Sequence, residues 1–166
     1  MLQHMSSEEK AMRRLFVWLG AVVSVAFAVI QIVPYGHNHT NPPVTQEPAW
    51  DRPETRALAV RACFDCHSNE TVWPWYSHIA PMSWLIQRDV DEGRRELNFS
   101  EWNRPQKEAR ESTASMKKNE MPPWFYALPA TNAALAAAER QTLITGLETT
   151  FGSKRARAGD GRNEDD

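Results

Sequence analysis

The longest apolar run of the chain lies near its N-terminus. Residues 15–33 are apolar apart from Ser24 and Gln31. A run of about 19 residues is long enough to cross roughly 30 Å of hydrocarbon as a helix. The pattern therefore predicts a transmembrane anchor over residues 15–33, preceded by a short N-terminal segment at residues 1–14.

The charges that flank this run predict the orientation of the anchor. Lys10, Arg13 and Arg14 precede it, and basic flanks stay preferentially in the cytoplasm. We expect a single-pass protein of the inner (cytoplasmic) membrane, with the rest of the chain on the periplasmic, extracytoplasmic side. A cleaved signal peptide is the alternative, because residues 26–28 have the small-x-small form of a cleavage site. The apolar run continues past that site to residue 33, which favours the uncleaved anchor.

The hydropathy pattern divides the remaining chain into three parts. Residues 34–51 are rich in Pro, Asn and His and have no period, which predicts an extended linker that holds the next domain off the bilayer. Residues 152–166 are charged and almost free of apolar side chains, which predicts a disordered tail. Between them, residues 52–151 have the length of one compact domain.

Apolar residues recur at helical spacing in four stretches of this domain. Pro53 opens the first stretch, Pro81 opens a second that Gly93 interrupts, and Pro105 opens a third, more polar one. The fourth covers about residues 134–150. No segment alternates for long enough to predict a strand. The prediction is an all-α domain with long loops rich in proline and tryptophan.

The charge balance limits the classes of partner. The chain has 19 Lys+Arg and 21 Asp+Glu, a net charge of −2, and a pI of about 6.2. This composition offers no basic face for a phosphate backbone, so we expect no nucleic-acid partner. Beyond residue 33 acidic side chains are in slight excess, which favours a protein partner with a basic docking surface.

The two cysteines of the chain lie three residues apart and are followed by a histidine. Cys63, Cys66 and His67 form the CxxCH pattern of c-type haem attachment. Cysteines one helical turn apart suit thioether bonds to the two vinyl groups on one porphyrin edge, and the next residue then places its imidazole under the iron. The motif predicts one covalent haem c with His67 as the proximal iron ligand.

Two other kinds of site, a zinc site and a redox-active dithiol, also use a CxxC pair. A zinc site would need further ligands, and His37 and His39 lie in the predicted linker, without the second ligand pair that zinc sites usually show. A redox-active dithiol favours a helix N-terminus after a strand, whereas a helix is predicted to enter this motif. Both alternatives are weaker than haem attachment. No GxSxG, HExxH, P-loop or GxGxxG pattern is present, so a carrier is favoured over a catalyst.

From about residue 41 to residue 151 the chain resembles the bacterial haem-binding-domain family of small monohaem cytochromes c. The matching motifs are ACFDCHSNET at 62–71, WPWYS at 73–77, AP at 80–81, SWL at 83–85, GR at 93–94, LNFSEW at 97–102 and MPP at 121–123. The resemblance implies a cytochrome-c-like helical fold, a covalent haem and electron transfer outside the cytoplasm.

Four side chains compete for the distal position on the iron. Met121 is preferred, because Met/His ligation is usual in cytochromes c and a following proline holds the methionine out of a helix. The family motif places a glycine two residues before this methionine; here Asn119 stands there, and asparagine tolerates positive φ. His78 is the main rival, while Met82 and Met116 have the helical spacing of core residues.

The remaining cofactor contacts are predicted from residue type. Aromatic side chains give a flat cofactor its walls, and the candidates are Trp73, Trp75, Tyr76, Trp84, Trp102 and Trp124. Each of them is equally well explained as part of a packed core. Arg94 or Arg95 is the candidate partner of a haem propionate, although arginines are more often solvated.

Two functions follow from a single haem. The first is a membrane-tethered carrier that exchanges electrons with extracytoplasmic redox proteins, after haem attachment by a cytochrome c maturation machinery. The second is a five-coordinate or labile-ligand haem protein that senses a gas or peroxide, or that serves as a peroxidase-associated subunit. Iron ligation separates them, because a methionine-ligated iron is closed to small ligands.

Overall fold

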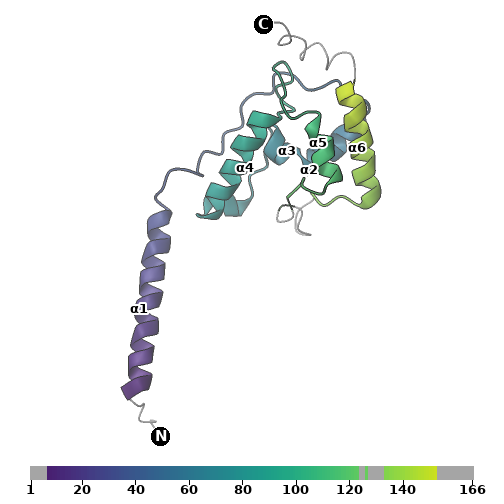
Figure 1. The fold of residues 1–166 in the computed structure, drawn as a ribbon. Coiled ribbons are helices and arrows are strands. Elements are labelled where there is room, and N and C mark those ends of the chain that lie inside the picture. Colours follow the sequence, from purple (N-terminus) through teal and green to yellow (C-terminus); the bar gives the residue numbers. More distant parts are fainter. Residues whose placement is uncertain (1–6, 124–125, 127–132, 153–166) are drawn as a thin grey trace, which may run out of the picture. The chain divides into compact units, whose positions relative to one another are not determined.

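The computed structural model describes residues 7–123, 126 and 133–152, and this part of the chain is helical (Figure 1). Its elements are α1 (Ser7–Ile30), α2 (Pro53–Ala62), α3 (Phe64–His67), the 3-10 helix η1 (Trp75–His78), α4 (Met82–Glu96), α5 (Glu111–Lys117) and α6 (Ala137–Gly152). Among these residues the strand-like pairing is limited to an isolated bridge between Gln46 and Glu101. The predicted all-α class is confirmed.

The chain forms two units that alternate along the sequence. The first unit comprises residues 1–38 and 74–87, and the second comprises residues 39–73 and 88–166. Helix α4 begins in the first unit and ends in the second.

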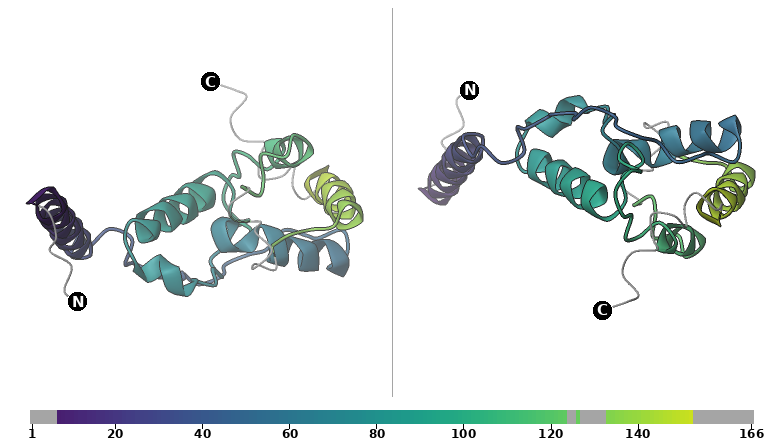
Figure 2. Two further views of the ribbon diagram at one scale, coloured as in Figure 1. Left: turned by 90° about the horizontal axis from the view of Figure 1, so that it is seen from below. Right: turned by 90° about the horizontal axis from the view of Figure 1, so that it is seen from above.

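The second unit has its core between α2, α5 and α6. Helix α6 packs against both α2 and α5, and both views in Figure 2 show it beside them. Gly146 of α6 permits close contact with α2, since a Cβ there would lie 2.1 Å from the Thr55 hydroxyl oxygen. The core side chains are Leu58, Ala59, Ala62, Phe64, Leu97, Phe99, Ala109, Met116, Leu143, Ile144, Leu147 and Phe151.

A row of aromatic rings extends this core. Phe64 and Phe99 stack with their centroids 5.4 Å apart, Phe99 stacks on Trp102, and Trp102 stacks on Phe151 at 5.4 Å. Trp50 lies 5.3 Å from Phe99 and continues the row. Such pairs stabilise by about 0.5–1.5 kcal/mol beyond the area they bury. The row fixes Phe64, the first residue of α3, in the core.

The second predicted helix is longer than expected. Helix α2 begins at Pro53 and α4 begins directly after Pro81, as predicted, but α4 continues through Gly93 to Glu96. A Cβ on residue 93 would lie 2.4 Å from the carbonyl oxygen of Cys66. Gly93 therefore stands inside the helix because the backbone of α3 approaches it closely, and the prediction that it interrupts the helix is wrong.

The third predicted helix begins later, at Glu111 rather than at Pro105. The Gln106 side chain accepts a hydrogen bond from the Asn98 amide at 2.8 Å and donates one to the Glu101 carbonyl oxygen at 2.8 Å. Side-chain bonds of this kind offer the backbone an alternative to the helix. Ala109, Thr113 and Met116 are nevertheless buried.

The segment predicted as a linker is extended, and its later part packs on the second unit. The Asn41 side-chain amide donates to the Thr71 carbonyl oxygen at 2.9 Å, and the Thr45 backbone amide donates to the Ser100 carbonyl oxygen at 2.9 Å. Trp50 lies against the core. These contacts differ from those of a free tether, because residues 41–50 are held along the domain.

The first unit contains α1, η1 and the beginning of α4. Helix α1 has 24 residues, none of them buried, and is long and apolar enough to cross a membrane. At 1.5 Å per residue it measures about 36 Å, slightly more than the hydrocarbon core of a bilayer.

Candidate functional site

Helix α3 brings the two cysteines and the histidine together in a single turn. The amides of Cys66 and His67 donate to the Cys63 carbonyl oxygen at 3.2 and 2.9 Å. The Ser68 hydroxyl closes the turn by donating to the Phe64 carbonyl oxygen at 2.8 Å. Because Phe64 is buried in the core, the turn is anchored on one side while its cysteines and histidine line a cavity on the other.

The hydrogen bonds of His67 fix which ring nitrogen carries the proton. Its Nδ1 lies 3.1 Å from the carbonyl oxygen of Gly93 and 3.1 Å from that of Leu97. Carbonyl oxygens only accept, so Nδ1 must be the N–H, and the lone pair resides on Nε2. Burial also lowers the pKa of His67, which favours the neutral ring. A neutral imidazole oriented through Nδ1–H is the form in which histidine binds a metal.

Beside this ring lies a cavity of about 350 Å³ within the second unit. Cys63, Cys66 and His67 contribute to its lining, together with Phe99 and Leu147 from the core. Carboxylates of Asp89, Glu92, Glu96 and Glu108 line other parts of it. The exposed lining is predominantly apolar, and both its size and its composition are typical of a cofactor site.

Both cysteine thiols are held in the protonated state. Burial raises the pKa of Cys63 to about 12. Burial also raises the pKa of Cys66 to about 12, with a smaller contribution from the negative charge of Asp89. Redox-active cysteines and zinc ligands act as thiolates, which low-pKa environments favour. This environment therefore argues against a dithiol, and the described residues include no cluster of three or more His, Cys, Asp or Glu side chains with metal-binding geometry.

Two of the four candidate distal ligands line the cavity. Met116, on α5, is buried in the core, whereas Met121 is 41% exposed. Asn119 lies between them with φ of 61°, so the expectation that it accepts a positive φ is confirmed. His78 and Met82 belong to the first unit and do not contribute to the lining.

The aromatic side chains that were predicted as walls of the cofactor site lie in several parts of the chain. Trp73 stacks on His39 with ring centroids 4.4 Å apart and is not part of the cavity lining. Trp75, Tyr76 and Trp84 belong to the first unit. Trp124 lies outside the described residues.

Among the described residues, the aromatic rings that line the cavity are Phe99 and Tyr126, neither of which was a predicted wall of the cofactor site. Tyr126 donates a hydrogen bond to the Asp65 carboxylate in α3. Phe99 lies inside the LNFSEW motif, so its position in that motif was the available signal. Tyr126 lies shortly after Met121 and the two prolines, but no spacing rule connects it to Asp65.

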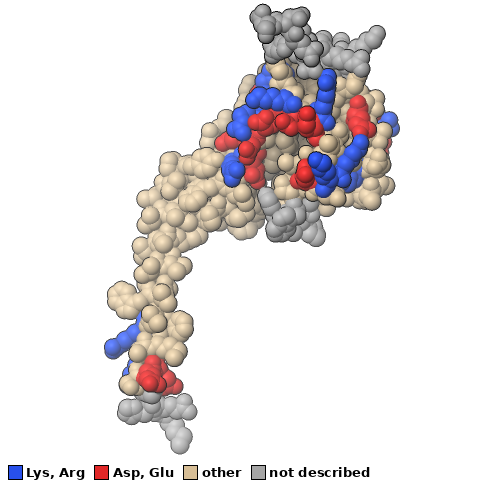
Figure 3. All heavy atoms as spheres, viewed as in Figure 1, with Lys and Arg blue, Asp and Glu red and all other residues tan. Residues whose placement is uncertain are grey.

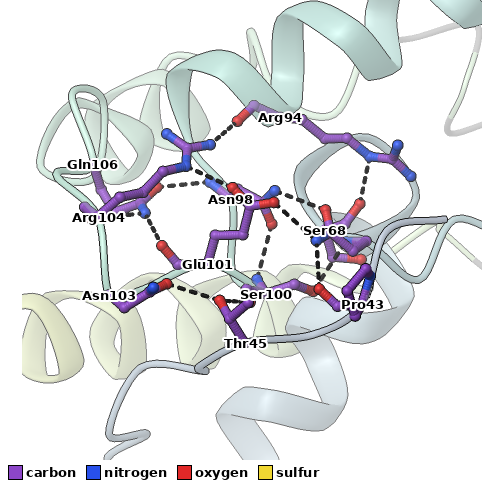
Figure 4. Close-up of polar contacts among 11 residues, drawn as sticks. Pro43, Thr45, Ser68, Arg94, Asn98, Ser100, Glu101, Asn103, Arg104 and Gln106 are labelled. Atoms are coloured by element: carbon purple, nitrogen blue, oxygen red, sulfur yellow. Dashed lines mark hydrogen bonds and ion pairs between the residues drawn. The ribbon is translucent and has the colours of Figure 1, made fainter.

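The Arg94 side chain lies among polar groups of the segments around α3. Its guanidinium donates to the Ser68 carbonyl oxygen at 2.8 Å (Figure 4). It also donates to the Thr40 carbonyl oxygen at 3.0 Å, the Asn41 side chain at 2.8 Å and the Thr71 hydroxyl at 2.9 Å. These four acceptors lie on the segments before and after α3. The arrangement indicates a structural tie between α4 and those segments, and the propionate contact of Arg94 stays a prediction.

A buried amide network holds Asn69, and Figure 4 labels its partners Asn98, Ser100 and Glu101. The Asn98 side-chain amide donates to the Asn69 side-chain oxygen at 2.9 Å, and the Asn69 side chain donates to the Glu101 carboxylate at 3.0 Å. The Asn69 backbone amide donates to the Ser100 hydroxyl at 2.9 Å. Hydrogen bonds from Asn69 and Arg104 lower the pKa of Glu101. The network joins the chain after α3 to the loop after α4, and no sequence pattern had assigned it a role.

Comparison with known proteins adds one finding. The model of a family described as haem-binding domain matches residues 25–149, from within α1 to within α6. The comparisons with curated proteins and with solved structures give no match.

Proposed function

The chain belongs to the family of haem-binding-domain proteins, and we propose that it is a c-type cytochrome that carries electrons at the outer face of a membrane spanned by α1. One observation carries the proposal. His67 presents the lone pair of Nε2 beside two protonated cysteines, at the edge of an apolar cavity. These residues fit a haem c, whose iron supplies one-electron redox chemistry when bound.

The two cysteines have the chemistry that covalent attachment needs. Each thiol adds across one vinyl group, so that the sulfur bonds one carbon and the thiol hydrogen ends on the other. The high pKa values of Cys63 and Cys66 keep both groups protonated before attachment. A cytochrome c maturation machinery would present the cofactor to them outside the cytoplasm.

We assign the distal position to Met121. Met116 already packs with Leu143 and other side chains in the core, as a structural methionine does. Met121 is part of the cavity lining and is partly exposed, and the proline after it keeps the segment out of a helix. Arg140 of α6 donates to the Met121 carbonyl oxygen at 3.1 Å, so the backbone at this point is tied to the core.

This ligand pair favours an electron carrier. With haem bound, Met121 and His67 would be the two iron ligands, which would leave no open position for a gas or peroxide and would raise the reduction potential relative to bis-histidine ligation. The acidic residues at the cavity, including Glu92 and Glu96, suit a redox partner with a basic docking surface. We expect such a partner among extracytoplasmic redox proteins.

Haem staining of the denatured protein tests covalent attachment. The full chain, made in cells with a cytochrome c maturation system, should keep its stain through denaturing electrophoresis, because thioether bonds survive unfolding. The double variant Cys63→Ser, Cys66→Ser should lose the stain, while Val72→Ala, at a side chain that is 76% exposed, serves as a control with both cysteines intact. Absence of stain from the matured wild-type protein would rule out a c-type site and leave non-covalent haem binding.

A further inference from the structure

The first unit is almost devoid of charge. After Arg14 its two segments, residues 15–38 and 74–87, contain no Asp, Glu, Lys or Arg. Figure 3 shows this unit as a continuous uncharged surface beyond the charges at the beginning of α1. The uncharged surface extends past α1, to segments that are too short or too irregular to span a bilayer themselves.

The uncharged segments outside α1 expose several large apolar side chains. Trp75 is 75% exposed and Ile32 is 81% exposed, while Ile79, Met82 and Leu85 are exposed to 36–41%. Met82 and Leu85 lie three residues apart on α4 and therefore share one helix face. An exposed patch of this kind on a soluble surface is costly and normally marks a contact with another apolar phase.

The apolar patch is tied to the end of α1 by hydrogen bonds within the same unit. The Gln31 side chain accepts from the Ala80 amide at 2.9 Å and donates to the Ala80 carbonyl oxygen at 3.1 Å. Gly36 has φ of 88°, and a Cβ there would lie 2.7 Å from the backbone of Ser83. The beginning of α4 therefore lies directly beside the chain that leaves α1.

We propose that residues 75–85 form a second, interfacial anchor that lies in the headgroup region of the membrane that α1 spans. The inference rests on the proposed membrane anchoring of α1. Gln31 is the polar residue near the end of the apolar run, so it marks the level of the bilayer surface, and its bonds to Ala80 keep the patch there. Tryptophan and tyrosine are the side chains enriched at that level, and Trp75 packs edge-on against Tyr76.

Lipid is the occupant that the chemistry of the patch favours. A surface that binds a protein partner usually has an apolar centre and a polar, charged rim. Residues 74–87 contain no charged side chain that could form such a rim. Uncharged apolar surface beside the end of a spanning helix continues the surface that the bilayer already covers. The domain would then be held at the membrane by two contacts instead of moving on a flexible linker.

Site-specific photocrosslinking in nanodiscs tests the interfacial anchor. A diazirine amino acid replaces Ile79, Met82 or Leu85, one position at a time, in the full haem-loaded chain reconstituted with phosphatidylethanolamine and phosphatidylglycerol. Val60 of α2 is the matched control, because it is 41% exposed, as Met82 is. Val22 of α1 reports on the span itself. We expect lipid adducts at position 22 and, several-fold above the Val60 level, at positions 79, 82 and 85.

Each outcome separates the interfacial anchor from the proposed span. Adducts at position 22 with only the Val60 level at 79, 82 and 85 would overturn the interfacial anchor and keep the transmembrane helix. Absence of lipid adducts at position 22 would overturn the membrane anchoring and the inference together. Adducts to a second protein at 79, 82 and 85 would replace lipid by a protein partner. An unchanged haem spectrum in each variant confirms that it has folded.

Discussion

The two sides of the proposed haem site are built differently. On the proximal side, the chain from Cys63 to Asn69 is held by the core, by two carbonyl oxygens on His67 and by buried amides. On the distal side, the segment from Asn119 to Pro123 follows α5, and its Met121 side chain is 41% exposed. The proximal geometry is thus fixed by the fold, whereas the distal ligand depends on a segment with fewer buried contacts.

Because of this difference, we expect the proximal side to determine haem attachment and the distal side to determine the reduction potential. Attachment and proximal ligation need several atoms in fixed positions, which a well-packed turn provides. The reduction potential and access to small ligands depend on the distal ligand, which can change without disturbing the core. Substitutions on the proximal side should therefore reduce the yield of haem protein, and substitutions on the distal side should alter its spectrum.

Gly93→Ala should have the largest effect. The new Cβ would lie 2.4 Å from the Cys66 carbonyl oxygen, which is backbone and has little freedom to move. Overpacking typically costs about 1–3 kcal/mol, and the result here should lie at or above the upper end. We expect little haem-stained protein after maturation. Gly152→Ala is the control, because no atom lies within 4 Å of its added Cβ, and a normal yield from Gly93→Ala would contradict the close packing of α3 and α4.

Met121→Ala should leave the protein folded and open the iron to ligands. Loss of the thioether should remove the weak ferric sulfur-to-iron band in the far red, lower the reduction potential and allow carbon monoxide to bind the ferrous form. Because the Met121 side chain is partly exposed, the direct loss of packing should be small. Absorption spectra with and without carbon monoxide, and a redox titration, measure these changes.

Met116→Ala gives the matched comparison for Met121→Ala. Met116 is buried in the core, so its truncation should cost about 2–5 kcal/mol in the free energy of unfolding while the spectrum stays that of the wild type. The reverse pattern, an altered spectrum from Met116→Ala and none from Met121→Ala, would assign the iron to Met116. Tight carbon monoxide binding by the wild-type protein would instead favour the gas- or peroxide-sensing alternative.

The sequence predicted the proximal side better than the distal side for physical reasons. Cys63, Cys66 and His67 lie within a single helical turn, so their juxtaposition is a local property that spacing reveals. The roles of Gly93 and Asn69 depend on contacts with residues far along the chain, which no local period records. Helix type was predictable because proline and apolar spacing are local signals.

Errors arose where tertiary contacts decided the structure. The predicted interruption at Gly93 followed the intrinsic preference of glycine, which the close approach of the Cys66 carbonyl oxygen overrides. The propionate role of Arg94 rests on residue type alone and stays a prediction, whereas the bonds of its guanidinium to four acceptors around α3 depend on tertiary contacts. Tryptophan content predicted cavity walls, whereas Trp50 and Trp102 lie in the aromatic row of the core.

Asn69→Ala should destabilise the proximal side without changing the iron ligands. The substitution would leave the buried Asn98 amide without its acceptor and remove one donor from Glu101. An unsatisfied buried polar group costs about 1–3 kcal/mol, so we expect a loss of about 2 kcal/mol in the free energy of unfolding. Denaturant unfolding followed by circular dichroism measures it. The exposed Asn103→Ala should cost less than about 0.5 kcal/mol, and equal losses in the two variants would contradict the importance of the buried network.

The smallest expected effect is the pH dependence that Glu101 contributes to stability. Hydrogen bonds from Asn69 and Arg104 lower the pKa of Glu101 in the folded protein below its unfolded value of about 4.3. A carboxylate with a lowered folded pKa stabilises the fold above the unfolded pKa, and this contribution is lost as the pH falls through the folded pKa. Since Glu101 is partly exposed, the contribution should be at most about 1 kcal/mol. Glu101→Gln should therefore reduce the loss of unfolding free energy between pH 7 and about pH 3. Glu120→Gln removes a negative charge from an exposed residue and provides the control. The contradicting outcome is that the unfolding free energy of Glu101→Gln falls with pH as much as that of Glu120→Gln and of the wild type. In that case the charge of Glu101 does not stabilise the proximal side, and the amides of Asn69 and Asn98 hold it without that charge.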